Sequence, residues 1–155
     1  MSDNGGRHVH TRSAGAIGVD VTHRYGKAFE IEARGHRLMV DQPVEADGAD
    51  LGPTPTELFV ASLAACAGLY AEGFLRRHGL GGDGLRVHAE ATMSSELPAR
   101  VARITLHLAG VPALPERRQA ALLAVVGRCT VHNSIHQAPE VRIELLPAAE
   151  AAARV

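Results

Sequence analysis

The residues best suited to chemistry in this chain are its two cysteines, Cys66 and Cys129, which lie 63 residues apart. Each falls within a segment of helical character. A cysteine pair in a cytosolic protein is more often catalytic, redox-sensing or metal-binding than a stable structural disulfide. Free cysteine is also among the most buried residue types, so two inert core cysteines are the alternative.

A reactive Cys66 would need help from outside its own helix. It lies about two and a half turns into the expected helix, where the helix dipole stabilises a thiolate only weakly. A nearby cation is therefore required to lower the pKa of the thiol. The preceding residues supply none, so we expect an arginine from one of the strands to approach it.

A metal site is the second chemistry that the spacing allows. Cys129, His132 and His136 stand at i, i+3 and i+7, which would align them on one helical face, and such a triplet could hold zinc. The alternative is that the two histidines are surface groups. The sequence contains no phosphate-binding loop, dinucleotide fingerprint or hydrolase motif, and we expect no metal and no organic cofactor.

Composition narrows the class of protein. The 155 residues are the usual size of one domain, and the net charge of −1 gives no support to a nucleic-acid or anionic-membrane partner. No apolar run approaches the roughly 20 residues that span a bilayer. The N-terminus lacks the basic and apolar regions of a secretory signal, so we expect a cytoplasmic protein.

Periodicity predicts an α+β chain with tails at 1–14 and 148–155 and a single domain over 15–147. Alternating apolar residues over 16–40 predict three strands, broken at Gly26 and at 34–35. The segment from Thr56 to His78 is the longest helix, which Thr54 or Thr56 can cap and which carries Glu57 in its first turn. Further elements follow in order: a hairpin over 85–93 and 102–108, a helix over 115–127, a short helix over 133–137, and a last strand around Val141, Ile143 and Leu145.

Both cysteine segments carry a family resemblance. Residues 52–58 (Gly-Pro-Thr-Pro-Thr-Glu-Leu) and 64–66 (Ala-Ala-Cys) resemble the first cysteine motif of the OsmC/Ohr superfamily, the osmotically inducible and organic-hydroperoxide-resistance proteins. Residues 129–132 (Cys-Thr-Val-His) resemble its second motif, whose usual form in the OsmC-like branch is Cys-Pro-Val-His. Residues 37–43 (Arg-Leu-Met-Val-Asp-Gln-Pro) are also similar to that branch. The resemblance runs over about 19–146, and the two motifs stand in the right order and at about the right separation.

The resemblance implies an OsmC/Ohr-like fold and a thiol peroxidase. Curved antiparallel sheets would wrap around long central helices in an intertwined homodimer. By position, Cys66 would be the peroxidatic cysteine and Cys129 the resolving one. An arginine from the first strand region would polarise the thiolate, with Arg24 the best match and Arg37 the second candidate. We expect Glu57 or an acceptor from Asp41 to Asp50 to orient the guanidinium. The substrate would be an organic hydroperoxide, and a dithiol would reduce the Cys66–Cys129 disulfide again.

One position departs from the resemblance. Where the family's hydroperoxide-resistance members carry a glutamate that pairs with the arginine, this chain has Thr56, and its glutamate is the next residue, Glu57. One residue along a helix turns a side chain by about 100°. The departure predicts that peroxidase activity is weak unless Glu57 reaches the arginine.

Three functions therefore remain as hypotheses. The first is a cytoplasmic, dithiol-dependent peroxidase for organic hydroperoxides. The second is a non-enzymatic protein on the same fold that binds a small apolar ligand, which the shifted glutamate favours. The third is a zinc-binding module built on Cys129 and the two histidines. A peroxide-consumption assay separates the first two, and metal analysis separates the third.

Overall fold

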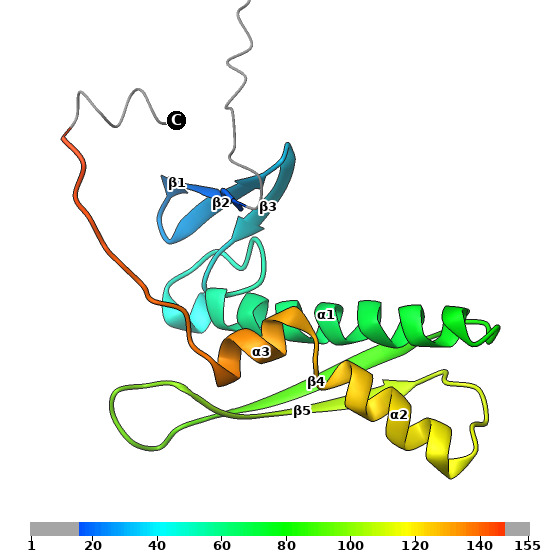
Figure 1. Cartoon of the computed structure of the whole chain (residues 1–155). Helices are drawn as coiled ribbons and strands as arrows, with labels where there is room; N and C mark the ends of the chain where they lie inside the picture. Colours follow the sequence, from blue (N-terminus) through cyan, green and yellow to red (C-terminus); the bar gives the residue numbers. More distant parts are fainter. Residues whose placement is uncertain (1–15, 148–155) are drawn as a thin grey trace, which may run out of the picture. The chain divides into compact units, whose positions relative to one another are not determined.

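The structure, a computed structural model, describes residues 16–147 of the chain (Figure 1). The expected tails at 1–14 and 148–155 lie outside the described residues. The chain divides into two compact units, one running up to Pro53 and the other beginning at Thr54. Its helices and antiparallel strands confirm the predicted α+β class.

The N-terminal unit is built around a three-stranded antiparallel sheet in the order β1-β2-β3. Gly26 and Gly35 lie in the two turns with φ of +55° and +82°, a conformation that glycine adopts without steric cost. The predicted meander is therefore confirmed. Its strands are β1 (Asp20–Tyr25), β2 (Ala28–Ala33) and β3 (His36–Val40).

A buried carboxylate organises the loop that leaves β3. Asp41 is only 1% exposed and accepts hydrogen bonds from the backbone N–H groups of Gln42, Ala49 and Leu51. Burial alone would raise the pKa of Asp41, but these N–H groups outweigh it and the pKa lies below its usual value. The loop, which contains the short 3-10 helix η1 (Val44–Ala46), is thereby closed on itself.

The C-terminal unit begins with the long helix α1 (Pro55–Arg77). Thr54 and Glu57 form a capping box at its start: the Thr54 hydroxyl accepts from the Glu57 N–H, and the Glu57 carboxylate accepts from the Thr54 N–H at 2.7 Å. Pro55 fits the first turn because a backbone N–H at this position has no partner within the helix, so proline loses no hydrogen bond there. These local signals explain why the helix follows its predicted bounds so closely.

The capping box yields a stability prediction. Thr54→Ala removes the hydroxyl that accepts from the Glu57 N–H, and we expect it to lower the free energy of unfolding by about 1 kcal/mol. Thr54→Ser keeps an equivalent oxygen and is the matched control. Urea unfolding followed by circular dichroism measures both variants. Equal midpoints for the alanine variant and the parent would show that the cap contributes nothing to stability.

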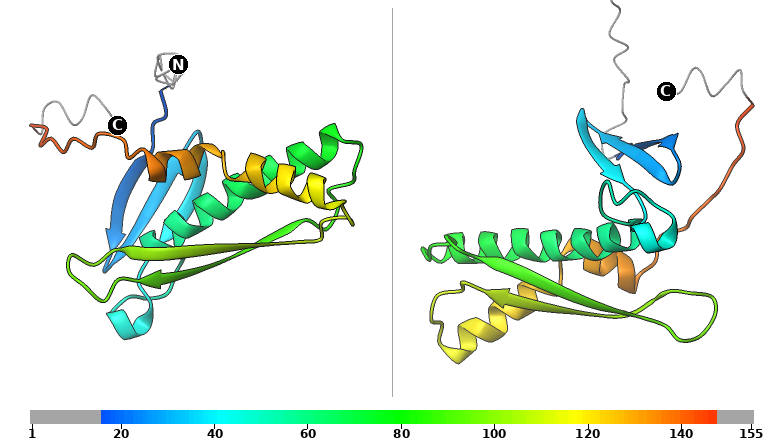
Figure 2. Two further views of the ribbon diagram at one scale, coloured as in Figure 1. Left: turned by 60° about the horizontal axis from the view of Figure 1, so that its bottom comes forward. Right: turned by 180° about the vertical axis from the view of Figure 1, so that it is seen from behind.

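The rest of this unit packs against one side of α1. A long antiparallel hairpin runs along the helix, and α1 also contacts the two later helices (Figures 1 and 2). The core is aliphatic apart from Phe74. These elements are β4 (Arg86–Met93), β5 (Val101–Ala109), α2 (Glu116–Val126) and α3 (Thr130–His136). The buried core consists of Ala67, Ala71, Phe74, Leu75, Leu114, Leu122 and Val126.

Much of α1 remains uncovered. Contrary to the expectation from sequence, the length and composition of α1 are sufficient for a membrane-spanning helix. The core helices of soluble proteins can also have such a length and composition. Only 28% of the most apolar 18-residue window of α1 is buried within this chain. Leu69 is 72% exposed and Phe59 is 42% exposed. Exposed apolar surface on this scale is typical of an interaction surface.

Two predicted elements need correction. The short helix α3 begins at Thr130 rather than at Asn133. The predicted last strand is absent from the described chain: residues 141–147 form no strand, and Ile143 and Leu145 are 92% and 98% exposed. Alternating apolar residues favour a strand only where a neighbouring strand supplies hydrogen bonds and a face to pack on, and this segment has neither here.

Candidate functional site

The two thiols meet within the C-terminal unit. The side chains of Cys129 and Cys66 are close enough for Cys66 to raise the pKa of Cys129, and both thiols are free. Cys66 projects from the middle of α1. Cys129 precedes α3 as its N-cap residue, so the prediction that it lies inside a helix was wrong. Its extended backbone, with φ of −64° and ψ of 150°, brings the chain out of the α2–α3 turn.

Burial distinguishes the two cysteines. Cys129 is fully buried, whereas Cys66 is partly exposed. Burial raises the pKa of the Cys129 thiol above its usual value, and the neighbouring Cys66 raises it further. The backbone N–H groups of His132 and Val131 offset part of this effect. Cys129 is therefore protonated at neutral pH and shielded from solvent, and Cys66 is the thiol that a dissolved molecule can reach.

A hydrogen bond beside the cysteines ties their two helices together. The hydroxyl groups of Tyr70 and Thr130 lie 3.2 Å apart. Tyr70 follows Cys66 by one turn of α1, and Thr130 follows Cys129 directly. Thr130 stands where the usual Cys-Pro-Val-His motif has proline, which has no hydroxyl. Sequence reasoning noted this difference without assigning it a role; the pairing with Tyr70 is visible only once α1 and α3 are in contact.

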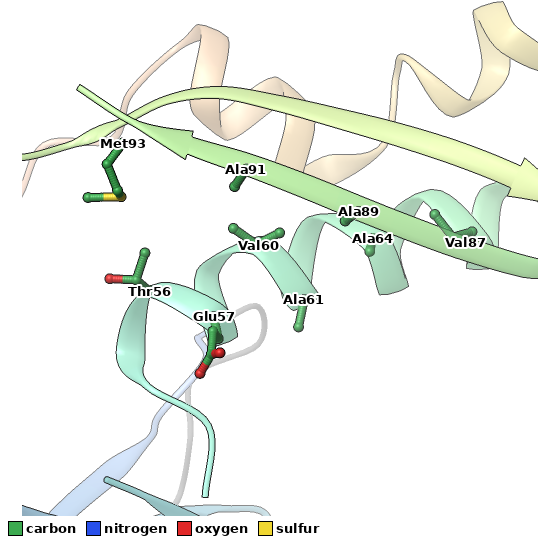
Figure 3. Close-up of a pocket in the computed structure, with 9 residues that line it drawn as sticks. All are labelled: Thr56, Glu57, Val60, Ala61, Ala64, Val87, Ala89, Ala91 and Met93. Carbon is green, nitrogen blue, oxygen red and sulfur yellow. The ribbon is translucent and has the colours of Figure 1, made fainter. Parts of the chain in front are cut away.

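A groove in the C-terminal unit lies between α1 and β4, and neither thiol lines it. It has a volume of about 560 Å³ and small apolar walls, with Thr56 and Met93 near one end and Val87 toward the other (Figure 3). Cys66 is not among its lining residues, so the groove is separate from the thiol pair. Its walls are Thr56, Glu57, Val60, Ala61, Ala64, Val87, Ala89, Ala91 and Met93.

Arg24, the predicted activating cation, lies on β1 in the N-terminal unit. There its guanidinium forms an ion pair with Glu30 of β2. Glu30 is also 3.9 Å from Arg37, whose closer partner is Glu32 at 3.1 Å. The hairpin register pairs Thr22 with Glu30 and shifts between His23 and Tyr25, so Arg24 is an extra residue of β1 opposite the Ala28–Phe29 pair of β2. Counting evenly outward from the turn at Gly26 would have paired Arg24 with Phe29, so sequence reasoning missed Glu30.

The acceptors expected to orient Arg24 are engaged elsewhere. Glu57 binds the backbone and the hydroxyl of Thr54, and these two hydrogen bonds hold the pKa of its carboxyl below the usual value. Asp41 binds the backbone of its own loop, and Asp47 lies 3.7 Å from Lys27. The structure thus gives Glu57 a capping role and gives Arg24 a different carboxylate partner.

The zinc hypothesis loses its geometric basis. Among residues 16–147, no three or more His, Cys, Asp or Glu side chains group as a metal site. Cys129 is outside the helix and faces Cys66, whereas His132 and His136 face each other on α3. The spacing of i, i+3 and i+7 brings three residues onto one face only when all three are helical, and Cys129 is not.

Solved structures resemble this fold. A protein of Psychrobacter arcticus described as an osmotic stress induced and detoxification response protein superposes with a TM-score of 0.72 at 21% identity, covering 83% of this chain and 93% of its own. An organic hydroperoxide resistance protein OsmC of Legionella pneumophila gives 0.61 at 18% identity, with 80% and 91% covered. OhrB of Bacillus subtilis, also an organic hydroperoxide resistance protein, gives 0.58 at 18%, with 86% and 100% covered. At these identities the likeness concerns the fold.

The sequence itself assigns the family. No curated protein matches the chain at a significant level. Residues 47–144, which include α1 and both cysteines, match the family described as OsmC-like protein. This match covers more than half of the chain and agrees with the structural neighbours and with the two cysteine motifs. The chain therefore belongs to the OsmC-like protein family.

Proposed function

We propose that this protein is a thiol-dependent peroxidase that reduces organic hydroperoxides to alcohols. The observation that carries the proposal is the contact between an accessible thiol, Cys66, and a buried one, Cys129, that are far apart in sequence. Two thiols in contact can be joined in a disulfide with little movement of the chain. Several structural neighbours are named for organic hydroperoxide resistance, which supports the same chemistry.

Each cysteine has a distinct part in the reaction. The Cys66 thiolate attacks the terminal peroxide oxygen, the O–O bond breaks, and the alkoxide leaves and takes up a proton to become an alcohol. Cys66 is then a sulfenic acid. The Cys129 sulfur attacks it, water leaves, and a disulfide forms before Cys66 can be oxidised further. An external dithiol returns the pair to two thiols by exchange. No metal or organic cofactor enters these steps.

The activating cation completes the proposal. The thiolate, not the thiol, attacks a peroxide, and a nearby positive charge stabilises the thiolate. We assign this charge to Arg24, with Glu30 rather than Glu57 holding its guanidinium. Arginine suits the role because its fork can bind a carboxylate and a second oxygen together. We place the protein in the cytoplasm, where dithiol reductants are available.

A peroxide-consumption assay tests the proposal. The reduced protein is mixed with cumene hydroperoxide and a dithiol, and loss of peroxide is followed together with formation of cumyl alcohol. We expect repeated turnover with a dithiol and a single turnover per chain without one. A protein that consumes no organic hydroperoxide under either condition would contradict the proposal.

A second candidate function is binding of a small apolar ligand without catalysis. The groove between α1 and β4 favours it, since about 560 Å³ of cavity with mostly apolar walls is in the usual range for ligand sites. A solvent-sensitive fluorescent dye tests this reading. Displacement of the dye by hydrophobic compounds, in a protein that consumes no peroxide, would favour the binding function.

We also propose that two copies of the chain form a homodimer over the uncovered face of α1. That face is too apolar to remain in water, and a permanent interface of more than roughly 2,000 Å² would cover it. Light scattering should give twice the 16.3 kDa mass of one chain. Leu69→Glu, at an exposed position of α1, should shift the mass toward one chain, whereas Leu123→Glu on α2 is the matched control. A monomeric parent at micromolar concentration would contradict the dimer.

A further inference from the structure

Two histidine side chains meet on the short helix α3, which follows Cys129 directly. His132 and His136 stand one turn apart, and their rings are nearly perpendicular, with an interplanar angle of 89°. Nδ1 of His132 lies 2.5 Å from the carbonyl oxygen of Gly127. A carbonyl only accepts, so this nitrogen carries the proton. Nε2 of a neutral His132 therefore carries a lone pair, which accepts a hydrogen bond from the Nε2–H of His136.

A metal ion between the two rings would take the place of the hydrogen-bonded proton. Nε2 of His132 and Nε2 of His136 are 3.0 Å apart. Imidazole nitrogens bind a metal ion at a distance of about 2.0–2.1 Å. If the angle between the two bonds at the ion is about 90°, the two nitrogens are about 2.9 Å apart. In a tetrahedral site the same bonds would separate them by about 3.4 Å. The observed spacing is that of an N–H···N hydrogen bond, and it is also closer to two adjacent ligands of an octahedral or square-planar ion than to two ligands of a tetrahedral one.

We propose that His132 and His136 form a two-nitrogen site for a divalent transition-metal ion of the Ni²⁺ or Cu²⁺ kind. Imidazole nitrogens suit these ions, and octahedral or square-planar geometry is the one they prefer. The Gly127 carbonyl acts as the outer partner that fixes the tautomer and orientation of a ligating ring. Water completes the coordination, since the rings lie at the rim of a small open pocket.

The neighbouring residues determine how tightly the site would bind a metal ion and which side chains can be ligands. Cys129 is excluded as a ligand because its thiol is buried against Cys66. Arg103 also lines the pocket, and its positive charge opposes a bound cation. With only two protein ligands, and with the positive charge of Arg103 nearby, the site would bind a metal ion that exchanges with solvent rather than one that holds the fold together. The site is independent of the proposed peroxidase activity, since it uses neither thiol.

A nickel titration of the full-length protein tests the proposal. The metal alone is added to reduced, isotope-labelled protein, and paramagnetic broadening of amide signals locates it. We expect broadening centred on α3, with an apparent affinity at least tenfold weaker in both His132→Ala and His136→Ala. His107→Ala is the matched control because it breaks the other histidine pair in the described chain, His88 with His107 across the hairpin, and should bind as the parent does.

The same titration can overturn the proposal. His136→Gln keeps the size of the side chain and should lose binding as the alanine variant does, which separates loss of a ligand from loss of the helix. Broadening centred on any other part of the chain, including His8 and His10, would remove the site. Equal affinity in His136→Ala and the parent would also remove it, as would loss of binding in Cys129→Ser with both histidines intact.

Discussion

Cys66→Ser should lower the rate of cumene hydroperoxide consumption at least about a hundredfold, about 2.7 kcal/mol of activation free energy. A serine hydroxyl is not ionised at neutral pH and cannot replace a thiolate as the attacking group. Cys129 is in contact with position 66 but is buried and protonated, so it cannot take over the reaction with peroxide. The rate is measured by the loss of peroxide with excess dithiol present.

Cys129→Ser is the matched variant, and it should fail at a different step. The first oxidation of Cys66 remains, so one equivalent of peroxide is consumed at the parent rate. Without a resolving thiol the sulfenic acid persists and is oxidised further to the sulfinic acid. Intact-mass spectrometry after added peroxide should show a gain of two oxygen atoms in this variant and a loss of two hydrogen atoms in the parent. Parent-like turnover by both serine variants would exclude the cysteines as catalysts.

Arg24→Met should slow peroxide reduction at least tenfold, about 1.4 kcal/mol of activation free energy. Methionine has a similar length but no charge, so the variant removes the cation proposed to stabilise the Cys66 thiolate. The pH dependence of Cys66 alkylation reports the same loss directly. Its midpoint should move to higher pH, because without the cation the thiol loses its proton less readily. Arg24 is a partly exposed residue of β1, so the variant should remain folded.

The carboxylate partners of Arg24 offer a matched comparison. Glu30→Gln removes the charge that pairs with Arg24, whereas Glu32→Gln removes the charge that pairs with Arg37. We expect Glu30→Gln to change the alkylation profile of Cys66 and Glu32→Gln to leave it as in the parent. An unchanged profile in Arg24→Met would eliminate this arginine, and Arg37→Met would then be measured.

The elements that the sequence predicted well are those whose signals are local. The bounds of α1 follow from Thr54, Pro55 and Glu57, which act within one turn, and the first sheet follows from short alternating runs separated by glycine. The last strand was predicted wrongly because alternation around Ile143 says nothing about whether a pairing strand is present. A single chain supplies no such neighbour to residues 141–147 within the part that the structure describes.

The sequence identified the residues of the candidate site, but it did not predict which of them are in contact. The two cysteine motifs identified Cys66 and Cys129, yet the N-cap position and burial of Cys129 depend on how α2 leads into α3. Glu57 was expected to orient an arginine, but its nearest donors are the N–H and hydroxyl of Thr54, three residues away. A carboxylate in the first turn of a helix readily accepts a hydrogen bond from the N-cap residue. A partner from elsewhere in the chain must displace that hydrogen bond before it can bind the carboxylate.

The separation of 63 positions between the two thiols has a consequence for the unfolded chain. A bond between Cys66 and Cys129 would close a loop containing β4, β5 and α2, and so remove many of the conformations open to the denatured ensemble. For a loop of this length the chain-entropy relation gives about 4 kcal/mol. Every catalytic cycle would thus pass through a form that resists unfolding more strongly than the dithiol form, and the oxidation state of the pair would set the lifetime of the protein against proteolysis.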